Sequence, residues 1–321
     1  MRILGLDIGG TKCAVTACDT ENNNIKVLDK KIFKTDTLTE GSKMIAGYYP
    51  VMHEYTEKYG CECIGISCGG PLDSGTGVII APPNLPNFKN VPIVKILENE
   101  FSVPAFLQND ANACALAEWL FGAGKGTQNM VFLTFGTGLG AGLILGGKLY
   151  EGTNGNAGEV GHIRLEPDGP FGFGKNGSFE GFCSGGGIAQ IGLKMGREAY
   201  AKGIKTPYYA PENEEDVNAK TISIAADNGD PTALEVYATS GKYLGKGLSI
   251  LIDILNPQRI VIGSIFTRSK ELLWDSCFEE MKKEALDVSL NVCEVVPALL
   301  HEQIGDFAAA TVGAYGMENR K

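Results

Sequence analysis

Short apolar runs separated by glycine-rich or polar turns dominate the first half of the chain and predict β-strands. Such runs occupy residues 1–6, 13–18, 25–34 and 61–67, and again 103–107 and 129–135. Apolar stretches of this length, bounded by turn residues, are typical of strands. The first two are joined by a Gly-Gly turn, which predicts a β-hairpin across residues 7–12.

Helical spacing of apolar positions marks other segments, and it dominates after residue 185. It covers residues 42–59, the helix formers of 114–121, the long stretch 232–255 and the C-terminal stretch 304–315. Strands that precede, separate and follow such helices favour mixed sheets over purely parallel ones. We expect the helix at 304–315 to pack back on the first domain, and the glycines of 122–126 to form a hinge.

Composition narrows the classes of protein that fit. The 321 residues exceed one ordinary hydrophobic core, so we expect two domains. A content of 44% hydrophobic and 21% charged residues is that of a soluble globular protein. The net charge of −10 argues against a nucleic-acid partner. Neither a membrane-spanning run nor a signal-peptide pattern is evident, so we expect a cytoplasmic location.

Nine cysteines raise the question of disulfides or a metal. Most lie in apolar strand or helix patterns, where a free thiol behaves as a small hydrophobe. Cys61, Cys63 and Cys68 look weakly metal-like, but no histidine lies near them in the sequence. Structural thiols are therefore the preferred interpretation.

Asn109 and Asp110 stand at a turn from the strand of 103–107 to the helix of 114–121. Such a turn exposes side chains while both flanks anchor the backbone, which suits a catalytic carboxylate. Asn and Asp are also the residues that most often cap helices. From these residues alone, a cap and a general base both remain open.

Two strand–glycine loop–strand units resemble one another. The first carries Asp7, Gly9, Gly10, Thr11 and Lys12. The second runs through Gly136, Thr137 and Gly138 to Gly142. Backbone N–H groups of such turns can bind phosphate, and a carboxylate such as Asp7 can hold Mg²⁺ through water. One Gly-Gly hairpin could be ordinary, but the repeat points to a nucleotide held by both halves of the chain.

Polar residues in other glycine- or proline-rich loops are candidates for ligand binding. Glu159 and His162 are three apart between glycines, Glu180 follows in a similar loop, and Asn84 lies beyond a Pro-Pro pair. Each has an ordinary alternative, as a core histidine, a solvated carboxylate or a surface turn. The residues alone do not decide between these alternatives.

Taken together, these motifs resemble the ROK family of sugar kinases and related repressors. The resemblance rests on residues 7–12, 69–73, 84–88, 109–113, 136–142 and 159–162. It implies a two-domain actin-like ATPase fold, which is ribonuclease H-like, with mixed sheets and an interdomain cleft. We expect a smaller domain of residues 1–109 with the C-terminal helix of 305–321, and a larger domain of residues 110–304.

The resemblance also implies roles. Asp110 would be the general base, while Gly70, Asn84, Asn109, Asp110, Glu159, His162 and Glu180 would bind the sugar. ATP would be held by Asp7, Gly9, Gly10, Thr11, Lys12, Gly136, Thr137, Gly138 and Gly263, with Mg²⁺ near Asp7. The expected reaction is transfer of the ATP γ-phosphoryl group to the 6-hydroxyl of a hexose, with glucose first and an N-acylhexosamine second. A homodimer is expected.

Two features bear on rival interpretations. Many family members bind structural zinc through three cysteines after the histidine, but this chain has Phe171, Phe173 and Ser178 there, so we expect no zinc. Family repressors carry a DNA-binding domain ahead of the kinase-like part, whereas Asp7 lies near the start of this sequence. A plain ATPase of the same fold would have no need of the residues expected to bind sugar.

Overall fold

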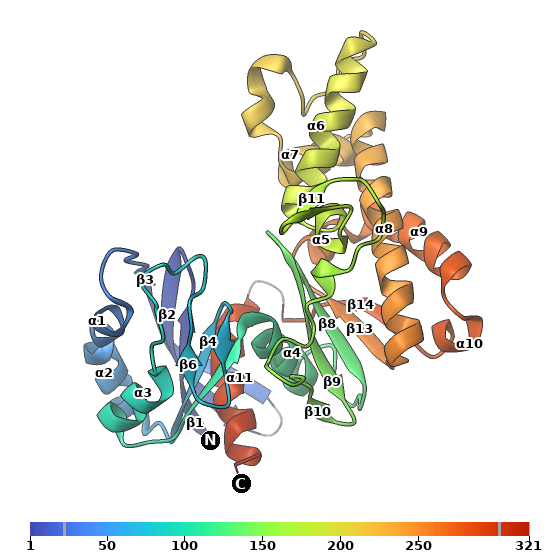
Figure 1. Ribbon diagram of the computed structural model, residues 1–321. Helices are drawn as coiled ribbons and strands as arrows, with labels where there is room; N and C mark the ends of the chain where they lie inside the picture. The colour runs from blue at the N-terminus through green and yellow to red at the C-terminus, as the bar shows by residue number, and fades with distance from the viewer. Residues whose placement is uncertain (22–23, 301–302, 321) are drawn as a thin grey trace. The chain divides into compact units, whose positions relative to one another are not determined.

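The computed structural model describes residues 1–21, 24–300 and 303–320. The chain forms two compact units (Figure 1). The first comprises Met1–Gly126, Gly142–Ala157 and Leu299–Lys321, and the second comprises Thr127–Ala141 and Gly158–Ala298. We expected a boundary after Asn109, but the first unit runs on to Gly126 because helix α4 (Asp110–Phe121) packs on helix α11 (Ile304–Glu318).

A five-stranded mixed sheet organises the first unit, in the order β3-β2-β1-β4-β7. Its strands are β1 (Arg2–Ile8), β2 (Lys12–Glu21), β3 (Asn24–Lys34), β4 (Cys63–Cys68) and β7 (Ala105–Asn109). β1 and β2 form the predicted antiparallel hairpin, and β3 continues it. β1, β4 and β7 run parallel, so the sheet is mixed as expected.

Helices cover both faces of this sheet (Figure 1). α2 (Tyr49–Tyr59) packs on β1 and β2, and α3 (Ile93–Phe101) packs on β7. The predicted helix of 42–59 is divided at Gly47 and Tyr48, so α1 (Gly41–Ala46) is separate. α11 packs on β1 and β4 from the other face, as its apolar sequence predicted. The short strands β5 (Leu72–Asp73) and β6 (Val78–Ile79) pair with each other.

The contact between α11 and β4 depends on glycine. A Cβ atom at Gly65 of β4 would lie 1.9 Å from the Ala309 carbonyl oxygen and 2.5 Å from the Gly313 nitrogen. No side chain fits at that separation, so the helix backbone rests almost directly on the strand. This close approach fixes where α11 lies on the sheet.

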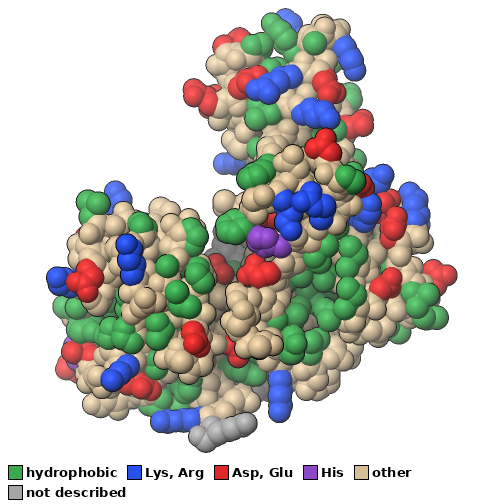
Figure 2. Space-filling view, viewed as in Figure 1, with side chains coloured by type: hydrophobic (Ala, Val, Ile, Leu, Met, Phe, Trp, Pro, Cys, Tyr) green, Lys and Arg blue, Asp and Glu red, His purple; other side chains and the backbone are tan. Residues whose placement is uncertain are grey.

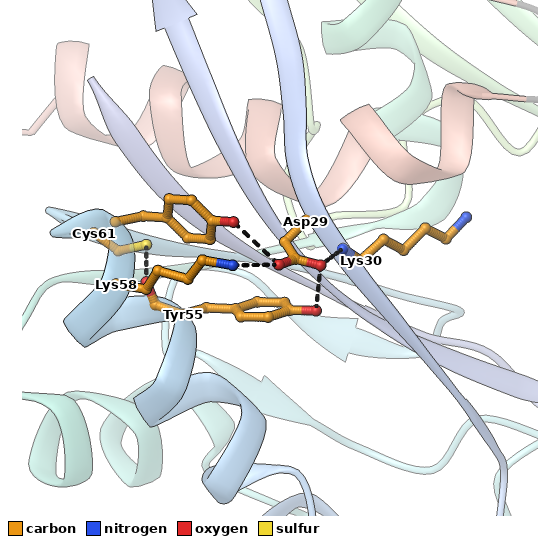
Figure 3. Close-up of polar contacts among 6 residues, drawn as sticks. Asp29, Lys30, Tyr55, Lys58 and Cys61 are labelled. Atoms are coloured by element: carbon orange, nitrogen blue, oxygen red, sulfur yellow. Dashed lines mark hydrogen bonds and ion pairs between the residues drawn. The ribbon is translucent and has the colours of Figure 1, made fainter.

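A polar cluster around Asp29 ties β3 to α2 (Figure 3). The Asp29 carboxylate accepts hydrogen bonds from the hydroxyls of Tyr55, at 3.1 Å, and Tyr59, at 3.0 Å. The Lys58 ammonium lies 3.1 Å from the same carboxylate. These donors, Lys58 first, lower the pKa of Asp29 to about 2. Because the charged form already has its partners here, we assign this cluster to stability.

The second unit contains strands β8 (Met130–Phe135), β13 (Arg259–Ile262) and β14 (Glu294–Pro297), which run parallel. These strands belong to a five-stranded sheet of order β10-β9-β8-β13-β14. In it, β9 (Leu139–Leu145) and β10 (Lys148–Leu149) pair antiparallel with each other. The boundary between the two units falls inside β9. The predicted long helix is α8 (Pro231–Leu255), which packs on α9 (Ile265–Glu284). Other elements are η1 (Val160–His162), β11 (Phe171–Gly172), β12 (Lys175–Asn176), α5 (Phe179–Phe182), α6 (Gly185–Ala201), η2 (Pro211–Asp216), α7 (Ala219–Asp227) and α10 (Asp287–Leu290).

Glu118 of α4 holds two backbone segments of the first unit. Its side chain is fully buried and accepts hydrogen bonds from the backbone N–H groups of Ala123, at 2.7 Å, and Leu300, at 2.8 Å. The first segment precedes the exit of the chain from this unit after Gly126, and the second follows its return at Leu299. One carboxylate therefore fixes the segments next to the first exit of the chain from this unit and next to its final return.

The surface charge, the hydropathy of the helices and the state of the cysteines are three further properties of the fold. Acidic and basic side chains are interspersed on the face shown in Figure 2, with no large patch of one sign there. Among the described residues, none of the helices is long and apolar enough to cross a membrane. All nine cysteines are free thiols and seven of them are buried, as expected of thiols that pack as small hydrophobes.

Candidate active site

The candidate residues of the first unit gather where three parallel strands end. β1 ends at Ile8, β4 at Cys68 and β7 at Asn109. Carboxyl ends of parallel strands share one edge of a sheet, and ligands of open α/β sheets bind there. The loops after β1 and β4 carry Gly9 and Gly10 and Gly69 and Gly70, and Asp110 begins the helix that directly follows β7.

A cavity of about 280 Å³ lies at this edge. Asp7 and Asp110 both line it, as do glycines and prolines of the surrounding loops. Its other lining residues include Ile8, Ser67, Asn84, Leu85, Cys114 and Ala308. Of the predicted residues in this unit, it brings together Asp7, Gly9, Gly10, Gly70, Asn84 and Asp110.

Asn109 and Asp110, the two residues at the start of helix α4, have different roles. Asn109 is its N-cap, and the Asn109 side-chain oxygen accepts a hydrogen bond from the Asn112 backbone N–H at 2.7 Å. Asp110 is the first helical residue, and its Oδ1 accepts from the Ala111 backbone N–H at 2.8 Å. The capping function considered for either residue belongs to Asn109, so the carboxylate of Asp110 is not needed as the cap.

Desolvation by the surrounding protein raises the pKa of both carboxylates that line the cavity. Solvent reaches Asp110 through the cavity, but protein atoms surround it on the other sides, and this desolvation raises its pKa. Burial likewise raises the pKa of Asp7 to about 6, with a smaller rise from the charge of Asp110. The Ser67 hydroxyl lowers the pKa of Asp7 by hydrogen bonding but does not offset its burial. Carboxyl groups with pKa values raised toward neutrality are suited to proton transfer.

The first glycine loop closes with a hydrogen bond from the Gly9 N–H to the Lys12 carbonyl, at 3.1 Å. A Cβ at Gly10 would lie 2.7 Å from the Asn84 Cβ, so only glycine allows Asn84 to approach this loop. Thr11 and Lys12 are exposed and do not line the cavity. Their side chains are therefore free to meet a ligand outside it.

In the second unit, Glu180 is bonded to the second glycine loop. Its Oε2 accepts a hydrogen bond from the Leu139 backbone N–H at 3.0 Å, and a Cβ at Gly138 would lie 2.7 Å from the same oxygen. Glu180 lies in α5, so the short helix and the loop of Gly136–Gly138 are held together. Thr137, between the two glycines, is exposed.

Glu159 directly precedes the short η1 turn, and His162 is the last residue of that turn. Glu159 is exposed and His162 is half-buried, and the His162 N–H donates to the Glu159 carbonyl at 3.2 Å. Gly161 lies between them with its Cα against Glu180, since a Cβ there would be 3.3 Å from the Glu180 Cβ. The structure thus brings the predicted trio Glu159, His162 and Glu180 into one region of the second unit.

Gly263 follows β13 and lies next to the second glycine loop through Ser264. A Cβ at Gly136 would lie 3.6 Å from the Ser264 Oγ. Ser264 has φ 57° and ψ −113°, a conformation that favours glycine. Ser264 therefore holds a backbone conformation that glycine would adopt without strain. Gly263 and the loop of Gly136 thus lie near one another through Ser264, and their role in nucleotide binding stays a prediction.

The residues at the family's zinc positions do not fit a zinc site. Phe171 and Phe173 are exposed and carry no metal donor, and Ser178 caps α5 by accepting from the Gly181 N–H at 3.0 Å. Cys183 is buried, and its thiol donates to the Ser240 carbonyl at 3.4 Å. Among the described residues, no cluster of three or more histidine, cysteine or acidic side chains could hold a metal. The expected independence of zinc stays a prediction.

Sequence reasoning assigned no role to two side chains that support the site. The Gln108 Nε2 donates to Glu151 Oε1 at 2.7 Å, and the Gln108 Oε1 accepts from the Asn112 Nδ2 at 3.1 Å. Gln108 thereby holds the strand end that precedes Asn109. The position of Gln108 beside Asn109 and Asp110 could have marked it as part of the site. Its partner Glu151 is distant in the sequence, and no feature of the sequence marked it. Ser67 is opposite Asp7 only through the register of β4 on β1.

Comparison with known proteins agrees with this geometry. The profile of the ROK family matches residues 3–317. A glucokinase of Thermotoga maritima is 30% identical over 315 residues, which cover 97% of each chain. A ROK glucokinase from Streptomyces griseus, solved in complex with glucose and AMPPNP, superimposes with a TM-score of 0.78 at 28% identity over 98% of this chain and all of that one. The DNA-binding regulator NagC of Escherichia coli is 33% identical over 233 residues, 71% of this chain and 55% of the regulator.

The chain therefore belongs to the ROK family and has the actin-like ATPase fold. Within that family it is a kinase of the hexokinase and glucokinase type.

Proposed function

We propose that this kinase transfers the γ-phosphoryl group of ATP to the 6-hydroxyl of an aldohexose, with glucose as the expected acceptor. The observation that carries the proposal is Asp110, a carboxylate of raised pKa that lines a cavity at the start of α4. A hydroxyl is a poor nucleophile until it loses its proton, and a positioned carboxylate can accept that proton as the bond to phosphorus forms.

The phosphate groups would be held by backbone N–H groups of the two glycine loops. Gly9 and Gly10, with Thr11 and Lys12, would contact them from the first unit. Gly136, Thr137 and Gly138 would contact them from the second, with Gly263 near the adenosine. Asp7 and Asp110 together suit a divalent cation, because Mg²⁺ takes one or two carboxylates and completes its shell with water and phosphate oxygens. When bound, Mg²⁺ would supply neutralisation of the phosphate charge.

The acceptor would be oriented by hydrogen bonds to its other hydroxyls. Gly70, Asn84 and Asn109 are the proposed sugar contacts in the first unit, beside Asp110. Glu159, His162 and Glu180 are those in the second. Asn109 already accepts from the Asn112 N–H through its oxygen, so its amide NH₂ group is the part left for a sugar oxygen. Glucokinase activity of a relative that covers 97% of the chain supports glucose over other hexoses.

A panel of acceptors in a coupled ADP-release assay tests the proposal. It should contain glucose, mannose, N-acetylglucosamine and N-acetylmannosamine, and phosphorus NMR of the product should identify the esterified hydroxyl. Glucose should give the highest kcat/KM and a 6-phosphate. A preference for an N-acylhexosamine would make that sugar the acceptor in place of glucose and would leave the proposed mechanism unchanged. Absence of ATP turnover with every sugar would contradict the proposal and favour a sugar-binding regulator.

The expected homodimer and the cytoplasmic location remain predictions. Light scattering at micromolar concentrations would settle the first, with twice the 34.1 kDa chain mass expected. Fractionation of cells that express the chain would settle the second.

A further inference from the structure

The segment between η1 and α5 is a small hairpin at the family's zinc positions. β11 pairs antiparallel with β12, Phe171 opposite Asn176 and Gly172 opposite Lys175. This register leaves Phe173 and Gly174 as the two turn residues, and their φ angles are 35° and 89°. Two central residues with positive φ define the turn that suits the twist of a tight hairpin. A bulky residue with positive φ is uncommon, so the position of Phe173 requires an explanation.

The hairpin tip contacts His162 in two ways. The ring centroids of Phe173 and His162 are 5.1 Å apart, and the rings lie nearly perpendicular at 81°. The Lys175 ammonium donates a hydrogen bond to the His162 carbonyl oxygen at 2.6 Å. One contact restrains the imidazole ring and the other restrains the backbone that carries it. Phe173 is otherwise 66% exposed, so this ring contact is not a by-product of core packing.

Hydrogen bonds also fasten the base of the hairpin to the segment that follows His162. The Arg164 Nη1 donates to the Asn176 carbonyl at 2.8 Å, and the Leu165 N–H donates to the Gly177 carbonyl at 2.8 Å. The Phe179 N–H donates to the Ile163 carbonyl at 2.8 Å. These bonds join the hairpin to residues 163–165, and Glu180 follows directly in α5.

We infer that Phe173 and Lys175 are positioning residues that orient His162 for the acceptor sugar without a metal. A zinc ion would fix a histidine by coordination through its ring nitrogen, which removes that nitrogen from hydrogen bonding. Here the ring is held by an aromatic contact and the backbone by an ammonium group, so both ring nitrogens stay available to sugar hydroxyls. The inference rests on the proposed function of His162 in sugar binding.

The chain offers matched controls for a test. Phe171 is 55% exposed in the same hairpin, and its backbone rather than its side chain bonds Gln190, so Phe171→Leu removes a ring of the same kind. Lys205→Met removes an exposed ammonium elsewhere in the second unit. The test variants are Phe173→Leu and Lys175→Met, with Lys175→Arg as the conservative rescue.

The first measurement is independent of catalysis. The sequence has three histidines, so the ring proton signals of His162 can be assigned by their loss in His162→Asn. Phe173→Leu should change the chemical shift of these signals because the ring current of Phe173 is gone, whereas Phe171→Leu and treatment with EDTA should not. An unchanged His162 signal in Phe173→Leu, or tightly held zinc near one ion per chain, would overturn the inference.

The second measurement separates KM from kcat. Phe173→Leu and Lys175→Met should each raise the sugar KM roughly 2–10-fold, the range expected for an aromatic contact or a charge-assisted hydrogen bond, with kcat within about two-fold. Lys175→Arg should restore the KM. Equal KM values for test and control variants would overturn the positioning role. Absence of turnover in the wild type alongside a shifted His162 signal would instead contradict the proposed function and leave the contact in place.

Discussion

The two units support their candidate residues in different ways. In the first unit, Asp7 and Asp110 lie at the end of a buried strand and at the first residue of a twelve-residue helix. In the second unit, Glu159 precedes a three-residue 3-10 turn that His162 ends, and Glu180 lies in a four-residue helix. The first set lies on long elements packed in a core, whereas the second lies on short elements that single hydrogen bonds tie to their neighbours, such as the bond from the Leu139 N–H to Glu180.

This difference separates two tasks of a kinase. A proton acceptor must meet one hydroxyl at one distance, and long elements packed in a core provide that accuracy. Residues that bind a sugar must match several hydroxyls, and loops can be adapted one contact at a time. We therefore expect substitutions in the first unit to affect turnover or global stability, and substitutions in the second to affect mainly acceptor affinity.

The largest effect is expected for Asp110→Asn. Asparagine is nearly isosteric but cannot accept the hydroxyl proton, so kcat should fall roughly 10²–10⁴-fold. Because Asn109 provides the cap, the midpoint of thermal unfolding should not fall, and at neutral pH the loss of a carboxylate whose pKa desolvation raises should increase it. Stopped assays with long incubation would measure the residual rate.

Sugar affinity provides the control for that variant. The amide that Asp110→Asn introduces would still bond a hydroxyl, so calorimetry should show a dissociation constant close to that of the wild type. Turnover near the wild-type value would exclude Asp110 as the general base.

A substitution at the contact of α11 with β4 should have the next largest effect. Gly65→Ala places a methyl group 1.9 Å from a helix carbonyl, so α11 must shift. Overpacking of this kind costs about 1–3 kcal/mol of unfolding free energy. Gly186→Ala in the second unit is the control, because its nearest atom would be 3.9 Å away. Urea titration should show a lower midpoint for Gly65→Ala only; equal midpoints would contradict the close approach.

Asp7→Asn should stabilise the protein at neutral pH while weakening its activity. The pKa of Asp7 is about 6 in the folded protein and near 4 when unfolded, so folding opposes its ionisation. The penalty appears as pH rises from about 4 to about 6 and is constant above that. Removal of the carboxylate should therefore add about 2–3 kcal/mol at pH 7.5 and almost nothing at pH 3.5. Thermal unfolding without nucleotide or Mg²⁺ at both pH values tests this; an equal gain at both would contradict it.

The smallest effect is expected in the second unit, at Ser264. Glycine adopts its backbone conformation without the strain that a Cβ causes, but gains more freedom on unfolding. Ser264→Gly should raise the unfolding free energy by up to roughly 1 kcal/mol, with the KM for ATP measured beside it. A lower unfolding free energy for Ser264→Gly would show that the serine side chain stabilises the fold by more than its backbone strain destabilises it.

Much of the first unit could be predicted from sequence because its elements are local. The strand of 61–67, the hairpin of 7–12 and the turn at Asn109 each have a hydrophobic period and a boundary signal within a few residues. The domain limits could not be placed, because the packing of α4 on α11 joins segments that are distant in the sequence. The contact of Phe173 with His162 could not be predicted from the sequence either, because it depends on the register of a short hairpin. The sequence showed which cysteines were replaced, but not how the phenylalanine packs.

The packing of α11 has a consequence for biosynthesis. The strands that α11 covers, β1 and β4, leave the ribosome long before it does, and the second unit is translated in between. Until α11 arrives, the face of the sheet that bears Ile3 and Cys63 lacks its partner and exposes apolar surface. The first unit, although it begins the chain, must therefore complete its core after the second unit has been made. Nascent chains stalled before α11 is translated should therefore be bound by chaperones or cleaved by proteases more often than chains that include α11.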